Sequence, residues 1–173
     1  MSTLLMNPVI GAQAIAFKPV INLGEEPFVP DGYVVQEHIV SGIGWDPAKV
    51  RLYWPVKSYG LTIMRYNELC KQLEGKYPYN VNLLRSYIAN GSLIPEEVKR
   101  RDLYVFLLGT IYRSISTGGF YVYFFTFGGK PEGKEMYGYD LCPLTHEFRS
   151  CDVVAVPWSM SPTSIFCSNA NNG

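Results

Sequence analysis

FYVYFFTFGGK, residues 120–130, is the most informative stretch of this sequence because six of its first eight residues are aromatic. In a strand, successive side chains point to opposite faces. A strand with one side in water alternates polar and apolar residues, and this run does not. It therefore predicts a strand buried on both sides, unless one face is an open platform for bases, sugars or a protein. The face in question carries Tyr121, Tyr123, Phe125 and Phe127.

The neighbouring segments predict a β-meander around this strand. LYVFLLGTIY at 103–112 is a continuous apolar run, and STGG at 116–119 supplies turn residues, so residues 103–127 predict an antiparallel hairpin. EMYGYDL at 135–141 predicts a third strand. Further strands are predicted at 33–40 and 152–156, and residues 49–54 favour a strand over one helical turn before Pro55.

Two short helices are predicted before the meander. In NELCKQLEG, residues 67–75, Asn67 can cap the first turn and Gly75 can end the helix. A second helix is predicted from Asn80 to Asn90, and one helical turn after Pro95. The predicted fold is α+β, an antiparallel β-meander packed against two short helices.

The chain is predicted to hold one domain between two less regular ends. Its 173 residues, 47% of them hydrophobic, can bury a single core. Residues 1–30 contain four prolines and predict an extended N-terminal arm, residues 31–157 the domain, and residues 158–173 a flexible C-terminal tail. Four cysteines are too few for a disulfide scaffold, and the apolar N-terminus is interrupted too early for a membrane span. We therefore expect a cytoplasmic protein without a membrane partner.

Charge gives a second hypothesis, nucleic-acid binding. The formal net charge is zero, yet residues 48–113 carry eleven basic against five acidic residues, a net of +6. The two helices over 67–90 could form a helix-turn-helix-like pair with the hairpin 103–127 as a wing. The contacting residues would be Asn80, Asn82, Arg85, Lys99, Arg100 and Arg101.

Catalytic signatures are absent from the sequence, which has no G-x-S-x-G, H-E-x-x-H or phosphate-binding glycine loop. LCPLTHEFRSCD at 141–152 is the one cluster with zinc-compatible or nucleophilic residue types. Its spacing is unusual for zinc, so ordinary buried thiols and a hydrogen-bonded histidine are the expectation. We predict no cofactor and do not favour an enzyme. The weak metal candidates are Cys142, His146, Cys151 and Cys167.

Several segments resemble a family of small, uncharacterised bacterial proteins. The resemblance rests on PFVPDGYVVQEH, WDPAKVRLYW, NELCKQLEGK and above all NVNLLRSYIANGSLIPEEVKRRDLYVFLLGTIYR, and it covers roughly residues 27–127. It implies the order of the elements and assigns no activity. Residues 141–173 depart from the family pattern.

Low charge and many aromatic residues favour a binding function. Charged residues make up 17% of the chain and aromatic residues 14%. A surface of this composition is typical of proteins that hold a partner. We predict a non-enzymatic binding or assembly protein that uses the Tyr121 face and the N-terminal arm for protein or self association.

Overall fold

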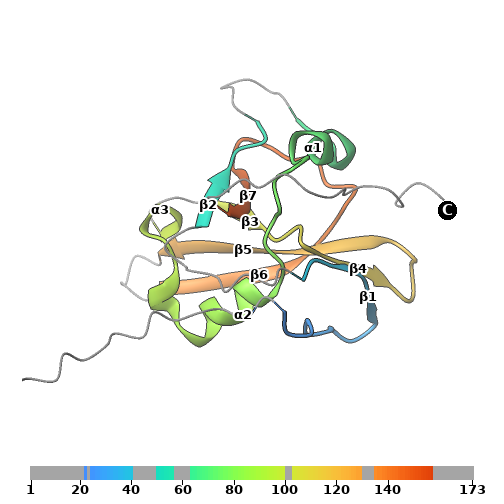
Figure 1. The fold of residues 1–173 in the computed structure, drawn as a ribbon, viewed down its shortest axis with the longest axis horizontal. Coiled ribbons are helices and arrows are strands. Elements are labelled where there is room, and N and C mark those ends of the chain that lie inside the picture. Colours follow the sequence, from blue (N-terminus) through green and yellow to red (C-terminus); the bar gives the residue numbers. More distant parts are fainter. Residues whose placement is uncertain are drawn as a thin grey trace, which may run out of the picture.

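The computed structural model describes residues 22, 24–40, 50–56, 63–99, 103–129 and 135–157 (Figure 1). These residues form seven strands and three α-helices, so the α+β class is confirmed. The strands are β1 (Tyr33–His38), β2 (Val50–Tyr53), β3 (Tyr104–Phe106), β4 (Thr110–Ser114), β5 (Phe120–Gly129), β6 (Glu135–Pro143) and β7 (Asp152–Pro157). The helices are α1 (Tyr66–Gln72), α2 (Asn82–Ala89), the 3-10 helix η2 (Gly91–Leu93) and α3 (Glu96–Lys99).

All seven strands belong to one mixed sheet, which corrects the predicted antiparallel meander. The order is β1-β4-β5-β3-β7-β2, and β6 pairs with β5. β3 and β7 run parallel, with Val105 opposite Val153. Parallel neighbours need a long crossover, and here the crossover contains β4, β5 and β6. The meander is thus one part of a larger sheet that recruits β1, β2 and β7 from distant sequence.

The predicted hairpin is present, but its first strand is broken. β3 and β4 both pair antiparallel with β5, and Leu107–Gly109 separates them. The segment that joins α1 to α2 lies against this break. The Tyr79 N–H donates to the Ala155 carbonyl at 2.9 Å, and the Gly109 N–H donates to the Tyr79 carbonyl at 2.9 Å. The connector is therefore fixed across the sheet by its backbone.

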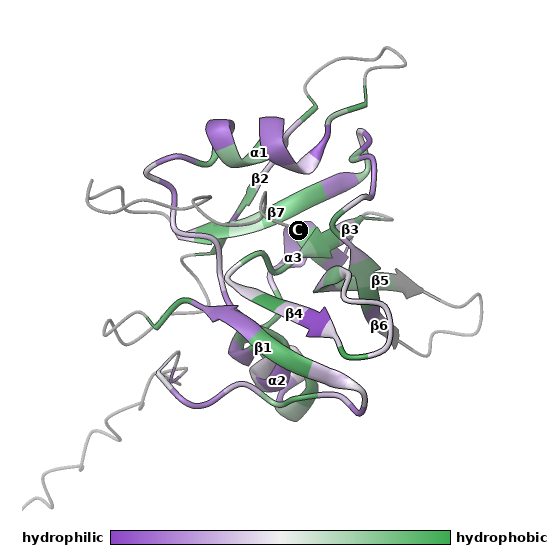
Figure 2. Ribbon diagram, turned by 90° about the vertical axis from the view of Figure 1, so that its right-hand side faces the viewer, coloured by the Kyte–Doolittle hydropathy of each residue, from purple (hydrophilic) through white to green (hydrophobic). Residues whose placement is uncertain are grey.

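The two helices cover opposite faces of the sheet (Figure 2). Leu83, Leu84 and Tyr87 of α2 belong to one apolar cluster, which we call the α2-side core. Leu69 of α1 and Leu73 after it belong to a second cluster, the α1-side core. The helices therefore do not form the side-by-side pair that the helix-turn-helix hypothesis assumes. The connector crosses the sheet between them.

Helix boundaries lie close to their predicted positions. α1 begins at Tyr66, one residue before the predicted cap, and the Arg65 N–H donates to the Glu68 carboxylate at 3.1 Å. α2 begins at Asn82, where the Asn80 side chain accepts the Asn82 N–H at 3.1 Å. A polar side chain that accepts from the first turn stabilises a helix start. The predicted turn after Pro95 is α3.

The end of the predicted N-terminal arm packs on the domain. Phe28 contacts the α2-side core, and its carbonyl accepts the Tyr112 hydroxyl at 2.8 Å. Residues 1–21 and the predicted tail 158–173 lie outside the described residues. No helix in the part of the chain that the structure describes is long and apolar enough to cross a membrane.

Candidate functional site

The face of β5 that the sequence singled out lies in the interior. Tyr123, Phe125 and Phe127 are 7%, 2% and 4% exposed, and all three belong to the α2-side core. Tyr121 is half-buried, and its ring meets Tyr33 of β1 edge-on at 5.3 Å between centroids. These residues are core, which corrects the hypothesis of an open binding face.

Both α2 and the N-terminal segment cover this face. The Tyr87 ring packs edge-on against Phe125 with centroids 5.5 Å apart. Phe28 packs against Tyr123 at 5.0 Å. Two elements far apart in the sequence therefore cover the same face of β5. At Phe28 the N-terminal arm packs on its own chain.

The opposite face of β5 is only partly covered. Phe120 and Phe124 are half-buried, and Tyr104 on the adjacent strand β3 is 43% exposed. The centroids of the Tyr104 and Phe124 rings lie 5.7 Å apart. The Leu144 N–H donates to the Phe120 carbonyl at 2.8 Å, so the segment after β6 lies beside the start of β5. Half-buried Cys142 lies on β6 opposite Val122. We call Tyr104, Phe120, Phe124, Cys142 and Leu144 the Phe124 surface.

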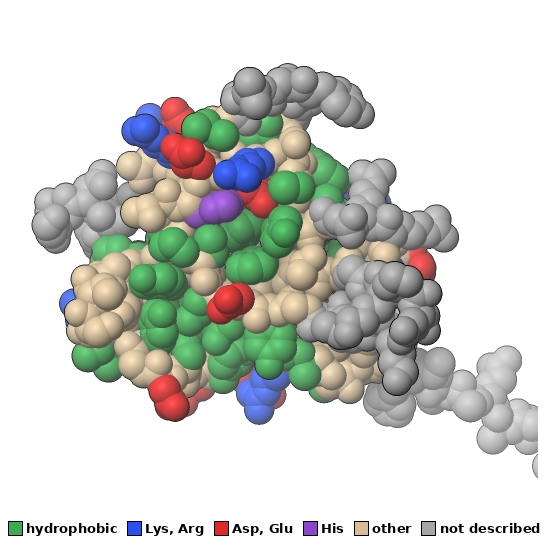
Figure 3. All heavy atoms as spheres, turned by 180° about the vertical axis from the view of Figure 1, so that it is seen from behind, with side chains coloured by type: hydrophobic (Ala, Val, Ile, Leu, Met, Phe, Trp, Pro, Cys, Tyr) green, Lys and Arg blue, Asp and Glu red, His purple; other side chains and the backbone are tan. Residues whose placement is uncertain are grey.

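Hydrophobic side chains gather on one face of the molecule. Seen from behind the view of Figure 1, they form a broad area that few charged groups interrupt, with a histidine near its border (Figure 3). Asp140 of β6 lies directly opposite Phe124 of β5 and is exposed. An apolar area rimmed by polar groups is the usual appearance of a protein interaction surface.

His146 and Asp152 form a polar pair beside the α1-side core. The His146 Nε2 lies 2.9 Å from the Asp152 Oδ2, and the Arg149 N–H donates to the same oxygen at 2.7 Å. Asp152 is 3% exposed, while the His146 ring stacks on Phe106 at 5.5 Å between centroids. A buried carboxylate needs such partners to offset its lost hydration. The pair therefore fixes the turn between β6 and β7.

Burial and nearby carboxylates disfavour the thiolate form of the two cysteines in this region. Burial, together with the carboxylates of Asp152 and Asp140, raises the pKa of the Cys142 thiol to about 11. Burial and then Asp152 raise the pKa of Cys151, whose Sγ lies 3.8 Å from the Asp152 Oδ1. Reactive cysteines have a lowered pKa. Cys151 thus contacts the carboxylate, and the geometry is not that of a thiolate–imidazole pair.

The weak metal candidates are not assembled into a site within the described residues. No three His, Cys, Asp or Glu side chains in that part of the chain are grouped so that they could hold a metal ion. Cys167 lies outside it. Three of the four candidates, Cys142, His146 and Cys151, instead have the contacts given above.

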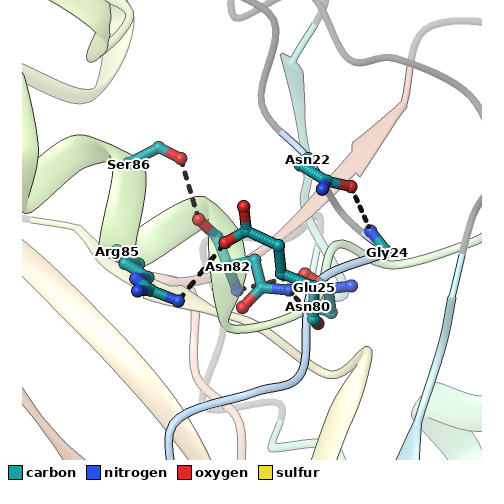
Figure 4. Close-up of polar contacts among 7 residues, drawn as sticks. All are labelled: Asn22, Gly24, Glu25, Asn80, Asn82, Arg85 and Ser86. Atoms are coloured by element: carbon teal, nitrogen blue, oxygen red, sulfur yellow. Dashed lines mark hydrogen bonds and ion pairs between the residues drawn. The ribbon is translucent and has the colours of Figure 1, made fainter.

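A second polar cluster joins the start of α2 to the N-terminal segment (Figure 4). The Asn82 Nδ2 donates to the Glu25 carbonyl at 2.7 Å, and the Asn80 Nδ2 donates to the Ile39 carbonyl at 2.7 Å. Arg85 on the exposed side of α2 pairs with the Glu25 carboxylate at 3.3 Å. Both asparagines are 2% exposed. Their amides hold the fold together and do not face solvent.

Of the six predicted nucleic-acid contacts, the four that the structure describes are not gathered on one open surface. Asn80 and Asn82 are buried, and Arg85 is paired with Glu25. The Lys99 Nζ lies 2.9 Å from the Glu96 Oε1, and the Lys99 side chain is only 19% exposed. Arg100 and Arg101 lie outside the described residues. A recognition helix reads bases with the residues of its first turns, and in α2 the first of these face inward.

No protein-family model, curated protein or solved structure matches this chain. The resemblance to small bacterial proteins stays a prediction.

Two important residues were missed at the sequence level. Tyr104 lies within a continuous apolar run, so its exposure could not be predicted from the pattern. Asp152 begins a strand and is charged, as surface residues often are, yet it is buried against His146. The six-residue separation of His146 and Asp152 gave no signal, because the turn between them decides whether the two side chains meet.

His38 gives a pH prediction for stability. Its Nδ1 lies 2.8 Å from the Thr110 hydroxyl oxygen, and its buried Nε2 has no hydrogen-bond partner among the described residues. Burial lowers the pKa of His38 from 6.5 in the folded chain, against a smaller opposing effect of the Glu25 backbone. The unfolded chain therefore takes up the proton more readily, and stability falls as the pH drops below about 6.5 towards the folded pKa.

We expect the free energy of unfolding to fall more steeply between pH 7 and pH 5 in the wild type than in His38→Asn. Asparagine keeps a polar atom near Thr110 and does not titrate. Urea titrations at several pH values measure the difference. Equal slopes in the two proteins would contradict the assignment.

Proposed function

We propose that this chain is a non-enzymatic assembly protein that associates with further copies of itself through the Phe124 surface. The observation that carries the proposal is the partial exposure of Tyr104, Phe120 and Phe124 on one sheet face. The proposed function is of the class that the composition predicts, a binding or assembly protein. The proposed contact lies on the Phe124 face of β5 and not on the Tyr121 face.

The energetics of this surface favour burial. Each square ångström of apolar surface removed from water contributes about 25 cal/mol. Aromatic residues are enriched in the centre of protein interfaces and charged residues are depleted there. Tyr104, Phe120 and Phe124 are held by the sheet and by each other, as the Tyr104–Phe124 contact at 5.7 Å indicates. They lose little side-chain entropy when a partner covers them.

A second copy is the occupant that the charge supports. The formal net charge of the chain is zero at pH 7, so two copies approach without overall repulsion. Proteins near zero net charge associate more readily. A two-fold axis can place the Phe124 surface on itself, the usual arrangement in homodimers. Asp140 is exposed and lies directly opposite Phe124 in the sheet, so this carboxylate lies within the surface.

The chemistry of the described residues supports a role other than catalysis. Cys142 and Cys151 have raised pKa values, and His146 is engaged with the buried Asp152. These contacts stabilise the turn before β7. None of them sets a nucleophile beside a free base.

We expect the wild-type protein to sediment as an oligomer, and Phe124→Ser to halve its mass. Serine removes the aromatic ring from the centre of the surface and leaves the β5 backbone in place. Analytical ultracentrifugation over a range of concentrations measures the mass. Ile88→Ser is the matched control, since Ile88 is 52% exposed on α2 and lies away from this surface.

The control should keep the wild-type mass. A wild-type protein that sediments as one chain at every concentration would contradict the proposal. Equal loss of mass in Ile88→Ser and Phe124→Ser would also contradict it, because the effect would then not be specific to the surface. Circular dichroism establishes that each variant is folded.

A further inference from the structure

Three strands lie at edges of the sheet among the described residues, and they differ in how they are protected. β1 pairs only with β4 and is interrupted by a register shift between Val35 and Glu37. β2 pairs only with β7 and has four residues. β6 pairs only with β5 and has nine residues in continuous register. Bulges and short length are devices that prevent edge pairing, and β6 uses neither.

The hydrogen-bond pattern shows which groups of β6 face outward. The Leu144 N–H donates to the Phe120 carbonyl at 2.8 Å, so residue 144 faces β5. Antiparallel pairs alternate between bonded and non-bonded positions. The even-numbered residues of β6 therefore bond to β5, and the odd-numbered residues point their N–H and C=O groups to the open edge.

One end of this edge is already satisfied by the chain itself. The Leu141 N–H, which points outward, donates to the Asp140 Oδ1 at 2.7 Å. Pro143, the next odd-numbered residue, has no N–H group. Among the described residues, the outward N–H groups that remain for a partner are those of Glu135, Tyr137 and Tyr139.

We propose that a second copy of this chain pairs with β6 along residues 135–139, antiparallel and with its two-fold axis at Tyr137. Tyr139 then lies opposite Glu135 of the second copy, and about six backbone hydrogen bonds form. A register centred on Tyr139 would have to break the hydrogen bond from the Leu141 N–H to the Asp140 carboxylate. A register centred on Asp140 would set two carboxylates against each other. Of these three registers, only the one centred on Tyr137 avoids both conflicts.

This inference rests on the proposed function, because it supplies a second contact in the same self-association. A two-fold axis between antiparallel edge strands is perpendicular to the sheet, so the Phe124 surfaces of both copies stay on the same side. Edge contact and face contact use different parts of the molecule. Together they give a tetramer in which two edge-paired dimers meet through their faces.

The test is Tyr139→Pro, alone and combined with Phe124→Ser, in analytical ultracentrifugation of the full chain. Proline at 139 removes an outward N–H, and β6 keeps its bonds to β5 because these come from even-numbered residues. We expect the mass of four chains for the wild type, two for each single variant and one for the double variant. Tyr139→Ala is the matched control, since it removes the side chain and keeps the N–H.

Each inference fails on a different result. An unchanged mass in Tyr139→Pro, with a halved mass in Phe124→Ser, overturns the edge pairing and leaves the face contact. The reverse result overturns the face contact alone, and a single-chain wild type overturns both. A halved mass in Tyr139→Ala overturns the backbone pairing. If Tyr139→Pro does not fold, Tyr137→Pro removes the outward N–H at the two-fold axis, and a wild-type mass in that variant overturns the proposal.

Discussion

Phe125→Ala should lower the free energy of unfolding by about 3–5 kcal/mol, the range for removing a large buried aromatic side chain. The Phe125 side chain is 2% exposed, lies opposite Val105 in the sheet and meets the Tyr87 ring at 5.5 Å. Alanine leaves a cavity between the sheet and α2, and neither rigid element can collapse to fill it. Natural domains are stable by roughly 5–15 kcal/mol in all, so the variant should be close to unfolding.

Urea denaturation followed by tryptophan fluorescence measures this loss. Phe124→Ala is the matched control, because it removes the same atoms one residue away on the other face. Phe124 is half-buried, and we expect its loss to cost about 1 kcal/mol. Equal costs for the two variants would contradict the assignment of the two faces.

Gly109→Ala should destabilise the protein by about 3 kcal/mol, the upper end of the range for overpacking. A Cβ at this position would lie 2.5 Å from the Pro78 carbonyl oxygen and 2.7 Å from the Asn80 nitrogen. These are backbone atoms, which cannot rotate away as a flexible side chain can. The connector would have to shift, and with it the bond from the Gly109 N–H to the Tyr79 carbonyl.

Thermal unfolding compares this variant with Gly119→Ala. A Cβ at Gly119 would meet the Thr117 hydroxyl and the Tyr121 ring at 3.4 Å, an ordinary contact distance. The control should change stability by less than about 0.5 kcal/mol. A neutral Gly109→Ala would show that the connector does not lie tightly against the break between β3 and β4.

Local pattern was sufficient to predict where strands lie, except for the break between β3 and β4. β5 is a run of aromatic and β-branched strand formers, and its hairpin with β3 and β4 follows from the turn at 116–119. Pattern could not show which of its faces is open, since both are apolar. That depends on Phe28 and Tyr87, which reach Tyr123 and Phe125 from distant parts of the chain.

Long-range pairings account for most of what was missed. The parallel contact between β3 and β7 joins residues about fifty positions apart, and no local signal specifies it. The helix-turn-helix hypothesis expected the two helices side by side because the segment GKYPY at 75–79 joins them. Its backbone bonds to Ala155 and Gly109 instead carry it across the sheet. Asn80 and Asn82 then become buried, although asparagines at a helix start usually face water.

Hydroxyl-radical footprinting with mass spectrometry at low and high protein concentration tests the central claim most directly. Oxidation reports how far each side chain is open to solvent. In dilute protein we expect Tyr104 and Phe124 to be oxidised while Tyr123, Phe125 and Phe127 are protected. At high concentration Tyr104 and Phe124 should become protected as well. Rapid oxidation of Tyr123 and Phe125 in folded, dilute protein, or oxidation of Tyr104 and Phe124 that does not depend on concentration, would contradict the account.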